Sequence, residues 1–254
     1  MGLPSLTLFA SARVRVRVRA PLAKASIKPL RVASASARHA HTRHAVVPKT
    51  AAQVEYARHL SDPSAALVIA TGAAGSGKTL LACAAALEHL DRGTVSRIVL
   101  VRPAVGAREE LGFLPGSLED KLRPWMAPLY DALGRDRMRT LTASGALEVA
   151  SVAQLRGRTF DDAFVVADEM QNADAAQFFM VATRIGQGCK MVMTGDPYQS
   201  DLPAGRSGLT DFLARLTDTA DQDGLIRVVR LGQADCQRHP VVKEVLAMYG
   251  SPGA

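Results

Sequence analysis

The stretch Leu67-Val-Ile-Ala-Thr-Gly-Ala-Ala-Gly-Ser-Gly-Lys-Thr79 decides the fold of this chain. It opens with a short apolar run, Leu67–Thr71, of the kind found in strands that are buried on both faces. Glycine occupies three of the next six positions, and a segment with a helical pattern, Lys78–Leu90, follows. We therefore predict a strand, a tight glycine-rich turn and a helix, which together begin a layered α/β domain.

The same alternation of short apolar runs and helical segments continues along the chain. The predicted strands are Leu67–Thr71, Arg97–Arg102, Leu147–Ser151, Ala163–Asp168, Lys190–Thr194 and Ile226–Leu231. The predicted helices are Lys78–Leu90, Leu118–Leu133, Ala173–Ile185, Leu209–Leu216 and Pro240–Tyr249. Because strands and helices alternate, we predict one α/β domain, with a mostly parallel sheet and helices on both of its faces.

The glycine-rich turn matches the pattern GxxxxGK[ST], which cradles nucleotide phosphates when it lies between a strand and a helix. In such a loop several backbone N–H groups point at phosphate oxygens, and the next helix adds the positive end of its dipole. The predicted phosphate-binding residues are Gly72, Ala73, Ala74, Gly75, Ser76, Gly77, Lys78 and Thr79. Lys78 would reach the β- and γ-phosphates of ATP, and the Thr79 hydroxyl would coordinate Mg²⁺. An ordinary turn would explain the glycines but not Lys78 and Thr79 at these positions.

Two adjacent carboxylates, Asp168 and Glu169, follow the apolar run that begins at Ala163. The carboxyl ends of strands in α/β sheets form the crevice where ligands bind. We predict that Asp168 holds Mg²⁺ and that Glu169 polarises the water that attacks the γ-phosphate. Alone, such a pair usually marks a strand that runs into solvent. Downstream of a phosphate loop, it indicates the acidic element of an ATPase.

Taken together, these motifs resemble those of the PhoH-like family of P-loop ATPases, which is related to the superfamily 1 helicase core. The resemblance extends from about Pro48 to Tyr249. It rests on Pro48-Lys-Thr50 with Gln53, the phosphate loop, Arg102-Pro-Ala-Val105, Leu111-Gly-Phe-Leu-Pro-Gly116, Arg156-Gly-Arg-Thr159, Asp168-Glu-Met-Gln-Asn172, Thr194-Gly-Asp196 with Gln199, and Arg238-His-Pro240. It implies a single RecA-like P-loop NTPase domain.

The resemblance also implies roles for further residues. Gln53 would read the adenine, Asp196 would lie beside the γ-phosphate, and Gln199 would sense the phosphate state. Hydrolysis needs cations on the charge that develops, and the candidates are Arg102, Arg156, Arg158, Arg184 and Arg238. A domain of this size has one ATP-binding lobe, so an arginine finger would come from a neighbouring subunit of a ring, a hexamer by family analogy. Arg238 and Arg184 are the preferred fingers, although surface or helix-capping roles explain each arginine nearly as well.

The net charge of +7 belongs to the N-terminal part of the chain. Residues 1–54 hold ten of the 31 Lys and Arg residues and no acid, which leaves 21 basic against 24 acidic groups in the rest. We predict that residues 1–47 form a basic, disordered leader resembling a transit peptide, and that residues 48–250 form the ATPase domain. The leader could instead be a basic strand or arm that contacts phosphate backbones, or non-native sequence from an upstream start codon. A transit peptide would direct the protein to a plastid or mitochondrion; otherwise we expect it in the cytoplasm.

Cysteine content and hydropathy argue against zinc-binding, disulfide-rich and membrane-spanning proteins. The three cysteines are widely spaced without a CxxC pair, so neither a zinc knuckle nor a disulfide framework is indicated. No apolar run approaches the ~18–20 residues that cross a bilayer, so we expect a soluble intracellular protein.

The leading hypothesis is a Mg²⁺-dependent ATPase that acts on single-stranded RNA, with a ribonuclease or the ribosome as a partner. The resemblance supplies the RNA part; aromatic residues make up only 5% of the sequence, so a base-stacking platform is not evident. The alternative is a nucleotide-dependent switch or assembly scaffold that acts on a protein or ribosomal partner. A small-molecule kinase is disfavoured, because Glu169 and Gln199 fit water activation and sensing better than a hydroxyl acceptor.

Overall fold

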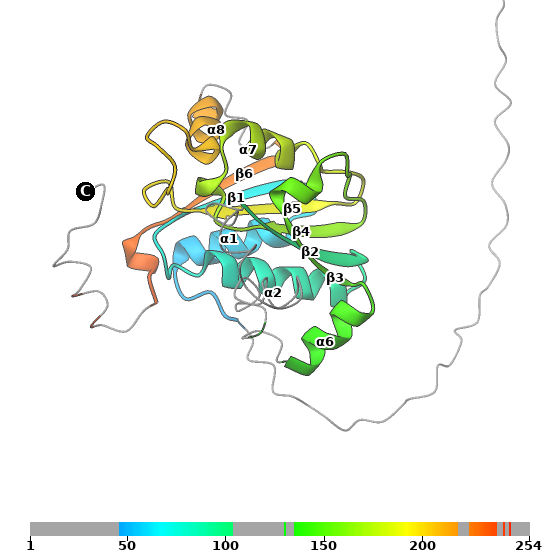
Figure 1. Cartoon of the computed structure of the whole chain (residues 1–254). Helices are drawn as coiled ribbons and strands as arrows, with labels where there is room; N and C mark the ends of the chain where they lie inside the picture. The colour runs from blue at the N-terminus through cyan, green and yellow to red at the C-terminus, as the bar shows by residue number, and fades with distance from the viewer. Residues whose placement is uncertain are drawn as a thin grey trace, which may run out of the picture. The chain divides into compact units, whose positions relative to one another are not determined.

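The computed structural model describes residues 46–103, 130, 135–217, 224–237, 241 and 244. They belong to one compact unit, Thr42–Ala254, built around a sheet of six parallel strands in the order β3-β2-β4-β5-β1-β6 (Figure 1). The strands are β1 (Leu67–Gly72), β2 (Arg97–Arg102), β3 (Leu147–Ser151), β4 (Ala163–Ala167), β5 (Lys190–Gly195) and β6 (Ile226–Leu231). The predicted α/β fold class is thereby confirmed.

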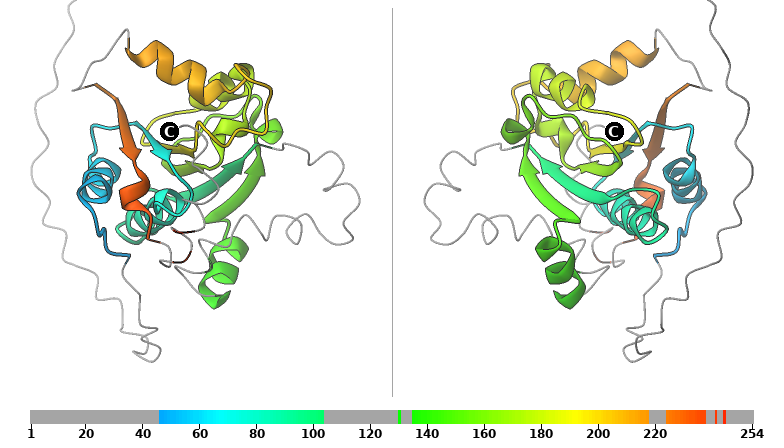
Figure 2. Two further views of the ribbon diagram at one scale, coloured as in Figure 1. Left: turned by 90° about the vertical axis from the view of Figure 1, so that its left-hand side faces the viewer. Right: turned by 90° about the vertical axis from the view of Figure 1, so that its right-hand side faces the viewer.

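Helices cover both faces of the sheet (Figures 1 and 2). One face carries α1 (Ala51–Ser61) and α2 (Lys78–Asp91), and the other carries α7 (Ala175–Ala182) and α8 (Gly208–Thr217). A further helix, α6 (Arg135–Ala143), contacts β3, and three short 3₁₀ turns follow strands: η2 (Val152–Leu155), η3 (Met170–Asn172) and η4 (Gln233–Asp235). Among the described residues, no helix is both long and apolar enough to cross a membrane.

The apolar runs form central strands because successive side chains enter two different cores. In β1, Val68 and Ala70 pack under α1 and α2, whereas Ile69 packs toward α7 and α8. In β4, Phe164 and Val166 likewise enter the first core. The central strands β1 and β4 are therefore apolar at nearly every position, as the continuous Val, Ile, Leu and Ala runs predict.

The parallel arrangement places the carboxyl ends of all six strands at one edge of the sheet. The phosphate loop follows β1, Asp168 follows β4, and Arg102 and Gly195 end β2 and β5. Since β5 lies between β1 and β4, its end also faces the crevice between the loop and the acidic pair.

The predicted strands are confirmed to within one residue at each end, and so are the helices that became α2 and α8. The helix predicted over Ala173–Ile185 is shorter at both ends: α7 begins after its N-cap Asp174, which accepts a hydrogen bond from Gln177 N at 2.8 Å, and it ends at Ala182. Helices α1 and α6 were not predicted. The predictions for Leu118–Leu133, Pro240–Tyr249 and the leader lie largely outside the described residues, so the boundary near residue 47 stays a prediction.

The three cysteines lie in the interior of the domain. Cys83, Cys189 and Cys236 are all buried and unbonded to one another. Burial raises the pKa of the Cys83 thiol far above its usual range, and it raises the pKa of Cys189 to about 11. The thiols of Cys83 and Cys189 therefore stay protonated, as is usual for small core residues.

Candidate nucleotide site

The phosphate loop begins at the last residue of β1, where the backbone tolerates only glycine. Gly72 has a φ of +138°, and a Cβ added there would lie 1.8 Å from the backbone oxygen of Leu231 in β6. Gly77, with a φ of +89°, is the N-cap of α2. Between them, the fully buried Ser76 hydroxyl lacks a hydrogen-bond partner among the described residues. The loop thus keeps its curved shape through glycine and holds an unused polar group, as a binding loop would.

Lys78, the first residue of α2, folds back over this loop. Its Nζ donates to the backbone oxygens of Gly72 at 2.6 Å and Ala73 at 2.9 Å. The side chain is largely buried, so its ammonium depends on these oxygens in the absence of a ligand. A phosphate group in the loop would offer the same donors a charged acceptor, which makes a stronger hydrogen bond.

Asp168 is the centre of the polar network at the sheet edge. Its Oδ1 accepts hydrogen bonds from the Thr79 hydroxyl, at 2.7 Å, and from the Thr194 hydroxyl of β5. Its Oδ2 accepts from Arg102 Nε at 3.2 Å and Nη2 at 2.6 Å. Residues of α2, β5 and β2 therefore converge on one buried carboxylate that follows β4.

Glu169 adopts a backbone conformation that is unusual for a residue other than glycine, with φ +58° and ψ +36°. Such strain persists only where the surroundings enforce it, and it concentrates at functional sites. The half-exposed carboxylate accepts a hydrogen bond from Gln171 Nε2 at 2.6 Å and lies 3.9 Å from Arg102 Nη2. Glu169 is thus turned out of the strand direction and held beside the crevice.

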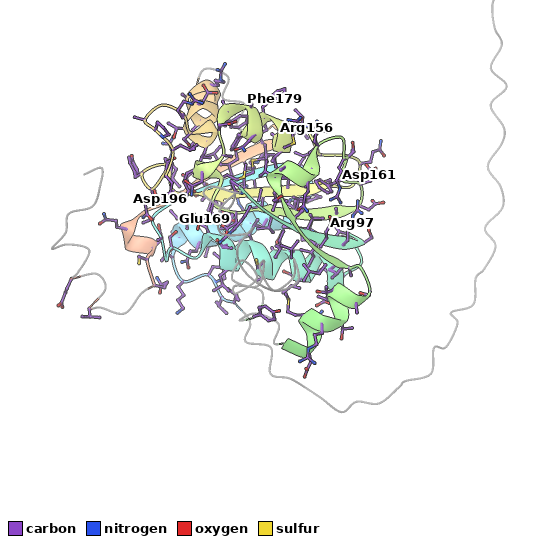
Figure 3. All side chains as sticks on the ribbon, in the orientation of Figure 1. Arg97, Arg156, Asp161, Glu169, Phe179 and Asp196 are labelled. Atoms are coloured by element: carbon purple, nitrogen blue, oxygen red, sulfur yellow. The ribbon has the colours of Figure 1, made fainter. Side chains whose placement is uncertain are left out.

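Gln171 connects the end of β4 to the end of β5. Its Oε1 accepts from Asp196 N at 3.1 Å, and its Nε2 also donates weakly to Gln199 O at 3.4 Å. Asp196 in turn shapes its own turn, since its Oδ1 accepts from Tyr198 N at 3.0 Å. The buried amide of Gln171 therefore links Glu169 to the turn that carries Asp196 and Gln199 (Figure 3 labels Glu169 and Asp196).

Gln53 lies in the first turn of α1, behind the phosphate loop. Its Nε2 donates to Ser76 O at 3.0 Å and Asp235 O at 3.2 Å, while its Oε1 accepts from Lys49 N at 2.7 Å. These bonds tie the loop to the segment after β6, which the sequence did not suggest. Both amide N–H groups are already in use, so reading an adenine would require Gln53 to exchange at least one partner.

The candidate arginines are spread over the sheet. Only Arg102 among the described candidates contacts the acidic pair. Arg158 pairs with Glu148 at the beginning of β3, and Arg184 donates to Met180 O at 2.9 Å and to Arg158 O at 3.1 Å.

Arg156 is exposed, and Arg184 lies near the edge where the strands begin. Figure 3 shows Arg97 and Asp161 at that edge, opposite Glu169 and Asp196. Within one chain Arg184 therefore cannot reach the phosphate loop, and its role as a finger stays a prediction for a neighbouring subunit. Arg238 lies outside the described residues; Gln237, just before it, donates from its backbone N to Gly75 O at 3.2 Å.

Sequence reasoning missed two polar residues of the network and one contact of a third. It assigned no role to Thr194 or Gln171, although both occur in the quoted motifs, at a strand end and two residues after Glu169. It proposed Arg102 as a candidate cation for phosphate, which stays a prediction, and it did not foresee the contact of this side chain with Asp168.

The oxygens around Thr79 suit Mg²⁺. This ion prefers oxygen ligands, keeps several waters, and usually binds one or two carboxylates together with substrate phosphates. A hydroxyl and a carboxylate at 2.7 Å beside a phosphate loop match that requirement. Within the described part of the chain, no group of three or more His, Cys, Asp or Glu side chains offers a metal site made of protein ligands alone.

A family model described as PhoH-like protein matches residues 45–250. The chain belongs to the PhoH-like family. A PhoH-like protein of Bacillus subtilis (strain 168) is 45% identical over 206 residues, which cover 79% of this chain and 63% of that protein. Protein PhoH of Escherichia coli (strain K12) is 38% identical over 224 residues, covering 84% and 60%. A solved structure of Pif1 helicases at forked dsDNA is a distant likeness, with 15% identity, a TM-score of 0.39 and coverage of 78% and 47%.

The PhoH-like match covers the same segment from which the fold and the resemblance were predicted, and it confirms the family. The matched part spans about three fifths of these curated relatives. Family membership and the phosphate loop together support a P-loop nucleotide-binding site.

Proposed function

We propose that this PhoH-like protein is a Mg²⁺-dependent ATPase that hydrolyses ATP to ADP and phosphate. One observation carries the proposal: the Thr79 hydroxyl and the Asp168 carboxylate meet at 2.7 Å although 89 residues separate them. Thr79 is the second residue of α2, directly behind the phosphate loop, and Asp168 follows β4 and precedes Glu169. This is the juxtaposition that a metal-bound triphosphate needs.

In this proposal each residue has a role that its position supports. The loop amides and Lys78 hold the triphosphate, and Thr79 and Asp168 hold Mg²⁺, which neutralises charge on the phosphates when bound. Glu169 accepts the proton of the attacking water, and Gln171 orients Glu169 through the 2.6 Å hydrogen bond. Asp196 and Gln199 respond to the γ-phosphate, since Gln171 connects them to Glu169.

Four further assignments are proposals: the first three rest on the family, and the last rests on the basic, acid-free composition of residues 1–47. Gln53 would read adenine by exchanging a hydrogen bond. Arg238 or Arg184 would act as an arginine finger from a neighbouring subunit of a homo-oligomeric ring. Arg184 could do so only if the sheet edge where the strands begin faces the nucleotide of the next subunit. We also propose that turnover serves RNA metabolism, with single-stranded RNA and a ribonuclease or ribosomal partner. Residues 1–47 would act as a targeting leader.

The experiment measures phosphate release from ATP and Mg²⁺ by the full chain, with and without single-stranded RNA, beside Glu169→Gln. We expect wild-type turnover to rise with RNA, and the variant to bind ATP without releasing phosphate. Turnover that depends on Glu169 but ignores RNA would favour the switch or scaffold alternative. Transfer of phosphate to an added acceptor, rather than its release, would contradict an ATPase.

A further inference from the structure

Asp168 has all of its acceptor capacity used by the protein itself. Its Oδ1 accepts two hydroxyls, from Thr79 and Thr194, and its Oδ2 accepts two N–H groups of Arg102. Four hydrogen bonds fill the lone-pair directions of a carboxylate. Asp168 can therefore serve a metal only if one of these partners leaves.

The charges indicate which partner leaves. The hollow beside Asp168 is lined mainly by apolar or weakly polar side chains, among them Cys83, Val149 and Val166. A carboxylate in such surroundings, with its side chain 9% exposed, requires a cation nearby. Arg102 is that cation, with Nη2 2.6 Å from Oδ2. The two hydroxyls are neutral and do not repel a metal ion, but the guanidinium does.

The Arg102 side chain has a second acidic partner within reach. It is the last residue of β2, and its side chain is 25% exposed, more than that of Asp168. The same Nη2 lies 3.9 Å from Oε1 of Glu169, whose side chain is 47% exposed. A rotation toward Glu169 would carry the guanidinium away from Asp168 without breaking the sheet, since the backbone of β2 stays paired with β4.

We propose that Arg102 is an exchangeable counter-ion of Asp168. Arg102 neutralises the carboxylate while the nucleotide site is empty, and it releases the carboxylate when Mg²⁺ and ATP bind. The inference rests on the proposed function and makes Arg102 a positioning residue. Its consequence is a site that is pre-formed yet binds Mg²⁺ less tightly than the same oxygens would without Arg102.

The test compares the wild-type chain with Arg102→Gln and with Arg92→Gln, an exposed arginine at the end of α2 that serves as the control. The readout is the Mg²⁺ concentration at half-maximal binding of a fluorescent ATP analogue. We expect Arg102→Gln to lower it roughly tenfold, the scale on which one neighbouring charge changes the affinity of a carboxylate for a cation. The control should match the wild type.

A second readout is the melting temperature without nucleotide. We expect Arg102→Gln to melt below the wild type, because Asp168 has lost its counter-ion, and Mg²⁺ alone should restore part of the loss. Mg²⁺ alone should leave the wild-type melting temperature nearly unchanged, since Arg102 already occupies the carboxylate. A variant that melts lower but ignores Mg²⁺ would show a purely structural ion pair and overturn the proposal.

Other outcomes also decide the matter. Slower phosphate release at an unchanged Mg²⁺ requirement would place Arg102 on the phosphate instead. If Arg102→Gln does not fold, Arg102→Lys keeps a charge but loses the two-point contact, and its Mg²⁺ requirement should fall below that of the wild type; an unchanged value contradicts the exchange. Failure of the proposed function is distinct, because the wild type itself would then show no Mg²⁺-dependent nucleotide binding.

Discussion

Gly72→Ala is the substitution whose effect the structure fixes most tightly. The added Cβ would lie 1.8 Å from Leu231 O, a backbone atom of the paired strand β6, so no side-chain rotation can relieve the clash. The φ of +138° adds strain, at about 1–3 kcal/mol. Relieving the clash should cost a further ~1–3 kcal/mol, as overpacking does. We expect a total loss of roughly 2–6 kcal/mol, a large part of the ~5–15 kcal/mol that stabilises a typical domain.

Gly205→Ala is the matched control, because Gly205 also has a positive φ, of +76°, but a Cβ there would meet nothing within 4 Å. Gly205→Ala should lower the free energy of unfolding only by the cost of the positive φ, about 1–2 kcal/mol. The assay is urea unfolding followed by circular dichroism, with the midpoint and slope compared across the variants. Equal destabilisation by the two substitutions would refute the claim that β6 closes against the first residue of the phosphate loop.

Three further predictions concern side chains. Lys78→Ala should weaken ATP binding at least tenfold, because the loop loses a charged donor, which bonds phosphate more strongly than neutral backbone N–H groups do; unchanged affinity in a fluorescent-nucleotide titration would contradict this. Gln171→Leu should cost about 1–3 kcal/mol, since the Asp196 N–H loses its buried acceptor, and should also slow phosphate release through Glu169. An unaltered unfolding midpoint and an unaltered rate of phosphate release would disprove that Gln171 connects Glu169 to the turn of Asp196. Burial lowers the pKa of Lys190 to about 8, so unfolding takes up a proton between about pH 8 and 10.5, and stability from this group rises with pH there. Lys190→Met should flatten the rise of the unfolding free energy with pH, measured by urea unfolding. If the unfolding free energy still rises with pH in this variant, another group causes the rise.

The strands were predictable because burial on both faces leaves a continuous apolar run that few other elements produce. Helix α1 was not, since its buried positions include the polar residues Gln53 and His59, which break an apolar periodicity. Helix α6 shows the same difficulty in a stronger form. Its sequence is mostly polar, and Met138 is the residue that it buries fully in the core.

The candidate site was predictable where a motif fixes both residue type and neighbour. Lys78 and Thr79 follow the loop directly, and Asp168 follows a strand. The partners of Asp168 depend instead on strand order: Thr194 reaches it because β5 lies between β1 and β4, and Arg102 because β2 lies beside β4. Local patterns contain little information on that order, so the contact of Arg102 with Asp168 was not predicted.

The measurement that tests the central claim most directly follows the labelled γ-phosphate of ATP in the presence of the wild-type chain, with Mg²⁺ and with a chelator. We predict that free inorganic phosphate appears with Mg²⁺ and that ATP stays intact with the chelator, because Thr79 and Asp168 act on a metal-bound triphosphate. ATP that stays intact in both conditions, or a label that moves to another acceptor, would contradict the proposed ATPase.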